Sequence, residues 1–255
     1  MLADQRIERI LALLETHGFR TNNLLASDLG VSEMTVRRDL AALAQNGQVK
    51  RVHGGARIVR RPESAQAQQR SALNGAEKRL IAETAADRIE DGETIYLDAG
   101  STMLELALAL KRRNFKSLRV VTNAVAVSAA LIGADITVVQ LGGELYRNTG
   151  AVTGQSALRF LESSRFDRCF LAASAANLEF GISDKHLPEI DIKRAAVGHS
   201  SWVALLMDAS KWESQGMLRV AALRDIHCFI TDARLSPQAR EAVRQRGPEV
   251  VIANE

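Results

Sequence analysis

The sequence feature that most constrains the fold is the segment Ser32–Leu40, SEMTVRRDL. Ser32 suits the N-cap of a helix, because its hydroxyl can accept a hydrogen bond from a backbone N–H group in the first turn. Val36, Leu40 and Leu43 follow at positions i, i+4 and i+7, which places them on one stripe of a helix. The segment therefore predicts an amphipathic helix that buries this stripe and exposes its opposite face.

Two shorter helices are expected before this one, and the three together form a DNA-binding layout. Thr21 can cap the second helix, Gly30 lies in the turn after it, and Gly47 is a stop signal for the third. The residues expected to face inward from the first two helices are Ile7, Ile10, Leu11, Leu14, Leu24, Leu25 and Leu29. Three helices in about 45 residues, with a tight turn before the third, predict that the third enters the major groove.

Positive charge is concentrated in the first quarter of the chain. Residues 1–61 carry 10 Lys and Arg against 6 Asp and Glu, whereas residues 62–255 carry 23 against 24. DNA binding requires such an excess, because neutralised phosphates supply a large share of the affinity.

Residues 51–56, RVHGGA, predict a basic hairpin with a glycine tip beside the third helix. The residues predicted to contact double-stranded DNA are Ser32, Met34, Thr35, Arg37, Arg38, Lys50, Arg51, His53 and Arg57.

The chain after residue 76 alternates helical and strand patterns. Helices are expected over Ala76–Ile89 and Thr102–Leu110. The apolar runs expected as strands are Thr94–Leu97, Leu118–Val121, Ile136–Leu141, Cys169–Ala172, Val203–Met207 and His227–Ile230. This alternation predicts an α/β domain whose mostly parallel sheet is covered on both faces. We therefore expect a winged helix-turn-helix domain over 1–60, a polar linker over 61–75 and a larger, mostly parallel α/β domain over 76–255.

Small, hydroxylated and charged residues follow four of these strands, at the sheet edge where such folds bind ligands. These segments are Asp98–Thr102, Thr122–Asn123, Gly142–Gly143 with Arg147, and Asp208–Lys211. Gly100, Ser101 and Thr102 open a helix, and the N–H groups and hydroxyls there predict an anion site that suits a phosphate. The alternative is that one of these hydroxyls only caps the helix.

Four charged residues can complete such a site. Lys211 and Arg147 can add positive charge beside the anion, and Asp98 and Glu189 can accept hydrogen bonds from sugar hydroxyls. Glu189 and Lys193 lie one helical turn apart, so the alternative is that they only form an i,i+4 ion pair.

The motifs of both domains resemble the DeoR family of bacterial transcription regulators. In the first domain the resemblance rests on VRRDL at 36–40, Gly47 and RVHGGA at 51–56, and in the second on the strand ends above with Gly154, Glu189 and Lys193. It implies a sensor domain related in fold to sugar-phosphate isomerases, a phosphorylated sugar or sugar-acid effector, and a homo-oligomer, either dimer or tetramer. The residues expected in the effector site are Asp98, Gly100, Ser101, Thr102, Asn123, Gly142, Gly143, Arg147, Glu189, Lys193 and Lys211.

These features predict a repressor of a carbohydrate or sugar-acid catabolic operon that is not an enzyme. The alternative is an isomerase-like enzyme with a DNA-binding appendage. Residues 173–177, ASAAN, count against it, because the related isomerases carry catalytic carboxylates there and this chain has none. Proton abstraction needs a positioned base, which Ser174 and Asn177 cannot supply.

Composition limits the setting in which the chain can work. No run of about 18 uncharged apolar residues is present, so no membrane partner is expected. Charged residues in the first helix argue against a signal peptide. Cys169 and Cys228 lie in apolar runs, which predicts buried free thiols and a reducing cytoplasm. No spacing of His or Cys indicates a metal site, and no cofactor is expected.

Overall fold

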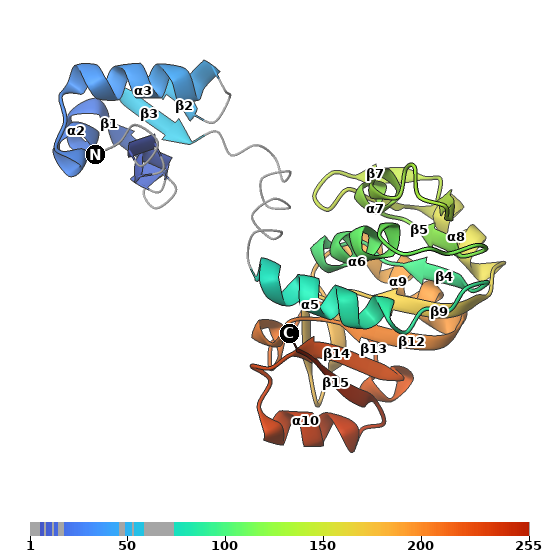
Figure 1. Ribbon diagram of the computed structural model, residues 1–255. Coiled ribbons are helices and arrows are strands. Elements are labelled where there is room, and N and C mark those ends of the chain that lie inside the picture. The colour runs from blue at the N-terminus through green and yellow to red at the C-terminus, as the bar shows by residue number, and fades with distance from the viewer. Residues whose placement is uncertain are drawn as a thin grey trace. The chain divides into compact units, whose positions relative to one another are not determined.

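The chain divides into two units, Met1–Ala65 and Gln66–Glu255 (Figure 1). The computed structural model describes residues 6–7, 9–11, 13–14, 18–45, 49–52, 54–58 and 74–254. All but two residues of the linker predicted over 61–75 lie outside this description, so its limits stay a prediction. Gly47 and His53 also lie outside it.

The first unit is a helical motif with a small sheet. The described residues between Arg6 and Leu14 are helical. They precede β1 (Phe19–Thr21), α2 (Asn22–Leu29), α3 (Glu33–Gln45), β2 (Val49–Val52) and β3 (Gly55–Ile58). The strands form an antiparallel sheet in the order β1-β3-β2, of which we predicted the β2–β3 hairpin but not β1.

Both predicted helix caps are confirmed. The Thr21 hydroxyl accepts a hydrogen bond from the Leu24 N–H group at 3.3 Å, and the Ser32 hydroxyl accepts one from the Thr35 N–H group at 3.2 Å. Gly30 ends α2 in the left-handed conformation with φ of 64°, where glycine has no steric penalty. These local interactions fix the turn between α2 and α3.

The core of this unit joins all three helices and the sheet. Its buried side chains are Ile10, Leu14, Leu25, Ala26, Leu29, Val36, Leu40, Leu43, Val49 and Ala56. Leu24 was predicted to face inward and does not, since it is 46% exposed. Leu25 and Leu29 are four residues apart and occupy the inner face of α2, which turns the neighbouring Leu24 outward.

The second unit is built on a parallel sheet of seven strands in the order β15-β14-β12-β9-β4-β5-β6. The strands are β4 (Thr94–Leu97), β5 (Arg119–Thr122), β6 (Thr137–Gln140), β9 (Phe166–Leu171), β12 (Ser200–Leu206), β14 (Cys228–Asp232) and β15 (Glu249–Ala253). The six predicted runs match the first six of these strands, and β15 was not predicted. The parallel α/β class is confirmed.

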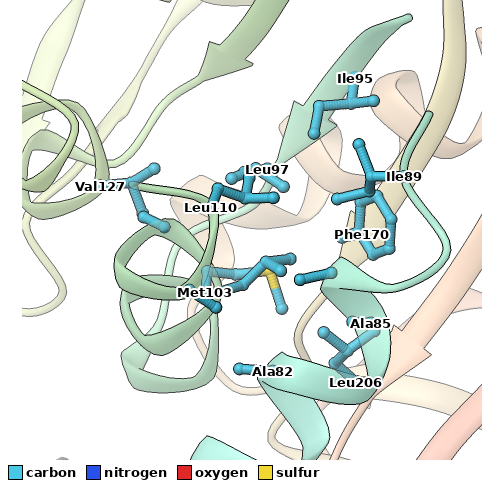
Figure 2. Packing of buried hydrophobic residues seen from close by; sticks show 14 of the residues in the cluster. Ala82, Ala85, Ile89, Ile95, Leu97, Met103, Leu110, Val127, Phe170 and Leu206 are labelled. Carbon is cyan, nitrogen blue, oxygen red and sulfur yellow. The ribbon is translucent and has the colours of Figure 1, made fainter. Parts of the chain in front are cut away.

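Helices cover both faces of this sheet. They are α5 (Gly75–Ala86), α6 (Ser101–Lys111), α7 (Val125–Ala130), α8 (Gln155–Glu162), α9 (Leu187–Gly198) and α10 (Pro237–Arg244). Side chains of α5, α6 and α7 pack on one face, where Met103 and Leu110 lie near Leu97 and Val127 (Figure 2). Side chains of α8, α9 and α10 pack on the other face. Burial on both sides explains why the strand sequences are continuously apolar.

Two smaller sheets complete the unit and were not predicted. One is the hairpin of β7 (Glu144–Tyr146) and β8 (Ala151–Thr153), and the other is antiparallel, in the order β10-β11-β13. Its strands are β10 (Ala175–Asn177), β11 (Gly181–Asp184) and β13 (Leu218–Ala221). Short 3-10 helices, η1 (Ala209–Lys211) and η2 (Leu223–Asp225), follow β12 and β13.

Within the described part of the chain, no helix combines the length and apolar character needed to cross a membrane.

The contrast between Leu40 and Leu24 gives a stability test for the first unit. Leu40 is 1% exposed at the centre of the core, so Leu40→Ala should lower the free energy of unfolding by about 2–5 kcal/mol. Leu24→Ala makes the same chemical change at a largely exposed site and should cost no more than about 0.5 kcal/mol. Urea unfolding followed by circular dichroism measures both values, and equal losses would contradict the observed facing of α2.

Candidate functional site

The exposed face of α3 and the β2–β3 hairpin together present a basic surface. Met34 is 76% exposed, and Arg37 and Arg38 are exposed beside it. Arg37 is held by Glu33 at 3.4 Å, one turn earlier. Among the hairpin residues, Lys50 on β2 is paired in register with Arg57 on β3, and both are exposed, as is Arg51. Ser32 and Thr35 form the cap of α3 and hydrogen-bond to each other at 3.0 Å.

The one acidic residue of α3 beyond its first turn does not weaken this surface. Asp39 is 6% exposed, and its carboxylate pairs with the guanidinium of Arg6 at 2.6 and 3.2 Å. Arg6 was not among the predicted functional residues. The sequence did contain a signal for Arg6, because Arg6, Ile10 and Leu14 follow one another at intervals of four residues and so lie on one helix face. The pair hides the negative charge and joins the first helix to α3.

A cavity of about 350 Å³ lies at the carboxyl ends of the parallel strands. The chain segments after β4, β5, β9 and β12 line it, together with the start of α9 and Thr149 from the β7–β8 loop. Six of the predicted effector residues line this cavity, namely Gly100, Ser101, Thr102, Glu189, Lys193 and Lys211. The volume falls in the range of small-molecule sites.

The N-terminus of α6 opens onto the cavity without a side-chain cap. Gly100 is the N-cap residue and has no side chain that could accept a hydrogen bond from the first turn. Its φ of 142° suits glycine, and an added Cβ would lie 3.4 Å from the Cβ of Ala172. The alternative in which Ser101 or Thr102 only caps the helix therefore does not describe this structure. Uncapped N–H groups and the positive helix end favour an anion here.

Lys193 is a buried cation that lines this cavity. It is 1% exposed, and its ammonium group pairs with Asp98, donates to the Ala172 carbonyl at 3.0 Å and lies 3.6 Å from Asp184 Oδ2. No ion pair joins Lys193 to Glu189 among the described residues, so the plain i,i+4 interpretation does not hold. The Thr149 hydroxyl instead donates to Glu189 Oε1 at 2.5 Å.

Burial and neighbouring charges set the ionisation of this cluster. Burial opposes the charged form of Lys193, but the carboxylates around it raise its pKa above the ordinary value. Burial raises the pKa of Asp98 and of Glu189, with Lys193 acting against the shift. Burial also opposes ionisation of Asp184, yet Lys193 and the Ser174 hydroxyl bring its pKa below the ordinary value. Lys193 therefore favours the charged form of the carboxylates around it.

Five predicted effector residues do not line the cavity. Asp98 lies behind it, where its Oδ2 accepts a hydrogen bond from the Ala172 N–H group at 3.0 Å. Asn123 is buried, accepts a hydrogen bond from the Tyr96 hydroxyl at 2.9 Å and donates to the Val152 carbonyl at 3.2 Å. Gly142, Gly143 and Arg147 are exposed around β7. Their part in binding an effector stays a prediction.

The backbone at position 143 requires glycine for a structural reason. Its φ is 148°, and an added Cβ would lie 2.3 Å from the Thr153 carbonyl oxygen. Only glycine permits that approach of β7 to β8. The hairpin then brings Thr149, rather than Gly143 or Arg147, to the cavity wall.

Asp184 and Lys185 also line the cavity and were missed, because they follow none of the predicted strands. Asp184 is the last residue of β11, and Lys185 lies between β11 and α9. Ser174 follows β9 and lines the same cavity. The Ser174 hydroxyl donates to Asp184 Oδ1 at 2.7 Å. The argument drawn from residues 173–177 was therefore incomplete, because β11 returns a carboxylate to the same place. The case against an enzyme rests on the relatives of the chain.

Comparisons with known proteins match both units. A family model for the DeoR-like helix-turn-helix domain matches residues 6–61, and one for the DeoR C terminal sensor domain matches residues 73–233. The "HTH-type transcriptional regulator GlpR" of Haloferax volcanii is 33% identical, and the match covers 98% of each chain. The "Lactose phosphotransferase system repressor" of Lactococcus lactis is 35% identical over 94% of this chain and 95% of that protein. The "Glycerol-3-phosphate regulon repressor" of Escherichia coli K12 is 31% identical over 91% and 92%.

Removing Lys193 tests the buried cluster. Lys193→Met leaves the carboxylates of Asp98 and Asp184 without their cation, which raises the pKa of both groups. The substitution should lower the free energy of unfolding by about 3–5 kcal/mol at pH 7. A carboxyl group with a raised folded-state pKa contributes stability that is complete below its unfolded pKa and is lost as the pH rises through the folded pKa. The deficit should therefore shrink as the pH falls toward about 4.

Guanidinium unfolding of the full chain between pH 4 and pH 8 measures this dependence. Lys185→Met is the matched control, because Lys185 also lines the cavity but is exposed, and it should change stability by no more than about 0.5 kcal/mol. A deficit for Lys193→Met that stayed constant with pH would argue against the cluster as described.

Proposed function

The chain belongs to the DeoR family of helix-turn-helix transcriptional regulators, and we propose that it represses a carbohydrate or sugar-acid operon until a phosphorylated metabolite binds its C-terminal cavity. The observation that carries the effector proposal is the uncapped N-terminus of α6, which opens onto a cavity that Lys211 also lines. Two relatives are named for glycerol 3-phosphate and for a phosphotransferase system, which supports a phosphorylated effector.

The exposed face of α3 is proposed to read the operator in the major groove. Met34, Thr35, Arg37 and Arg38 would meet base edges there, while Arg51, His53 and Arg57 of the hairpin would hold the phosphate backbone. Backbone contacts set affinity and register, and base contacts set the choice of sequence. The buried Arg6–Asp39 pair supports this assignment, because it keeps the only acid within 37–61 away from the DNA.

The effector is proposed to bind with its phosphate at α6 and its hydroxyls toward α9. The N–H groups of the first turn and the hydroxyls of Ser101 and Thr102 would donate to phosphate oxygens, and Lys211 would supply a positive charge. The carboxylates of Asp184 and Glu189 line the same cavity and would accept hydrogen bonds from the hydroxyls of the sugar. Lys193 offsets the charge of these carboxylates, so the floor of the cavity does not repel an anion.

Control of operator binding by the effector requires that the effector bind two states of the protein with unequal affinity. A ligand that lowers the operator affinity of the protein by a factor of 10–100 needs a coupling free energy of about 1.4–2.8 kcal/mol. We propose release as the direction of the effect. The repressor would act as a homo-oligomer, dimer or tetramer, whose symmetry matches a repeated half-site.

We also propose a cytoplasmic location, where operator DNA is accessible and thiols stay reduced. Cys169 and Cys228 are both free and buried. Burial raises the pKa of the Cys228 thiol to about 12, so it stays protonated and unreactive at neutral pH.

The experiment that tests this function is fluorescence anisotropy with DNA from upstream of the operon that encodes the chain. The titration is run at about 150 mM salt, since affinity depends on salt, and is repeated with a panel of phosphorylated sugars and sugar acids. Sequence-dependent binding that one compound weakens supports the whole proposal. Sequence-dependent binding that no compound changes would retain the DNA-binding part and remove the effector part.

Arg38→Ala tests the proposed groove-facing side of α3. Loss of a contact with a base edge should weaken binding to the specific operator by about 1–3 kcal/mol and leave binding to unrelated DNA nearly unchanged. The measurement is the ratio of the two Kd values. Lys50→Ala removes a proposed phosphate contact and should instead weaken both Kd values alike and reduce the salt dependence. An unchanged ratio for Arg38→Ala would show that another face reads the bases.

Ser101→Asp tests the anion site. A new carboxylate at the N-terminus of α6 should repel a phosphate, since like charges about 4 Å apart repel by several kcal/mol in a partly desolvated site. The effector Kd should rise at least about tenfold by isothermal titration calorimetry, while operator binding without effector is kept. Ser156→Asp is the matched control, because it makes the same change in the first turn of α8, outside the cavity. Unaltered effector affinity in Ser101→Asp would place the phosphate elsewhere.

A further inference from the structure

Asn74, the first residue of the C-terminal unit that the structure describes, does not play the usual role of an asparagine before a helix. It precedes α5 in the left-handed conformation, with φ of 56°, and makes no side-chain cap hydrogen bond. Asparagine is among the best helix caps, so this omission needs a reason. The side-chain amide instead donates to Asp208 Oδ1 at 3.0 Å and to the Ser210 hydroxyl at 3.2 Å.

Arg234 holds the same amide from its other side. Its guanidinium donates to Asn74 Oδ1 at 3.3 Å and pairs with Asp232 at 2.8 Å and with Glu77 at 3.4 Å. Asp232 Oδ2 in turn accepts a hydrogen bond from the Ala209 N–H group at 2.9 Å. The start of α5 is therefore fastened to the chain that follows β12 and β14. We call the amide of Asn74 and its partners Asp208, Ser210 and Arg234 the α5 clasp.

The α5 clasp shares Asp208 with the cavity. The carboxylate of Asp208 is buried, and its Oδ2 has no hydrogen bond among the described residues. The ammonium group of Lys211 lies 3.9 Å from that oxygen and donates to the Ala173 carbonyl at 3.1 Å. Lys211 lines the cavity directly. One carboxylate thus faces the cavity lysine with one oxygen and binds the amide of Asn74 with the other.

We propose that Asn74 is the positioning residue through which an anion in the cavity changes the start of α5, and with it operator affinity. The inference rests on the proposed function and adds the residue that carries the response. An anion that attracts Lys211 weakens its hold on Asp208 and on the Ala173 carbonyl. Asp208 then reorients, and the hydrogen bond from the Asn74 amide is loosened. The chain before Asn74 leads to the DNA-binding unit, so the change is made where the two units are connected.

The variant that isolates this role is Asn74→Gly. Glycine adopts a positive φ without a steric penalty, so the backbone is kept while the amide is removed. Alanine would add strain at this φ and is a poorer choice. Asn114→Gly is the matched control, because Asn114 is an exposed asparagine after α6. Lys211→Met removes the cation on the cavity side.

A double-mutant cycle on the full chain tests the connection without any effector. The readout is hydrogen exchange of the Lys78 amide, which donates to the Asn74 carbonyl in the first turn of α5 at 3.0 Å. Lys211→Met should change this exchange rate by about fivefold or more in the wild-type background and by less than about twofold in Asn74→Gly. Asn114→Gly should leave the effect of Lys211→Met intact. Equal effects of Lys211→Met in all backgrounds would overturn the proposal.

The second arm uses glycerol 3-phosphate, glucose 6-phosphate and inorganic phosphate as probes. If one of them weakens operator binding of the wild-type protein about tenfold, Asn74→Gly should bind that probe equally well and lose most of the tenfold response. A full response in Asn74→Gly would overturn the clasp and leave the proposed function standing. If no probe binds the wild-type protein, the effector proposal loses its support, and the exchange cycle alone decides on the clasp.

Discussion

The ion pairs of the buried Lys193 ammonium group are the interactions on which the cavity end of the C-terminal unit depends. This group lies among Asp98 after β4, Asp184 at the end of β11, and the carbonyl of Ala172 after β9. Three elements that are far apart in the sequence therefore meet at one buried charge. Burying an ammonium group costs free energy unless neighbouring groups pair with it. These pairings fix the positions of the three neighbours. The cavity takes its shape from this requirement.

The same charge explains how a cavity with two carboxylates can be suited to an anion. Asp184 and Glu189 both line it, and by themselves would repel a phosphate. Lys193 offsets their charge, while the uncapped start of α6 and Lys211 add positive charge to the cavity lining. In the proposed binding mode, the polar groups are divided into a cationic set at α6 and Lys211 and a hydroxyl-accepting set of Asp184 and Glu189. This division favours a ligand that carries an anion at one end and hydroxyls at the other.

Buried ion pairs serve the two units in different ways. In the N-terminal unit, Asp39 pairs with Arg6, which removes a negative charge from α3 and joins two helices. In the C-terminal unit, the carboxylate of Asp208 is shared between Lys211 at the cavity and Asn74 at the start of α5. In the first arrangement, both carboxylate oxygens of Asp39 accept hydrogen bonds from Arg6. The second leaves Asp208 Oδ2 without a hydrogen bond among the described residues, and it is the arrangement proposed to respond to an anion in the cavity.

Much of this protein follows from local sequence, because caps, apolar spacing and strand alternation act over a few residues. Ser32, Thr21 and the stripe of Val36, Leu40 and Leu43 determined the helical motif, and continuous apolar runs determined six strands of the parallel sheet. Local pattern could not place Leu24, could not foresee the two small antiparallel sheets, and could not tell which strand ends reach the cavity. Those features depend on contacts between distant segments, such as the return of Asp184 to Ser174. The tertiary structure alone decided them, since burial and charge pairing act through space and not along the chain.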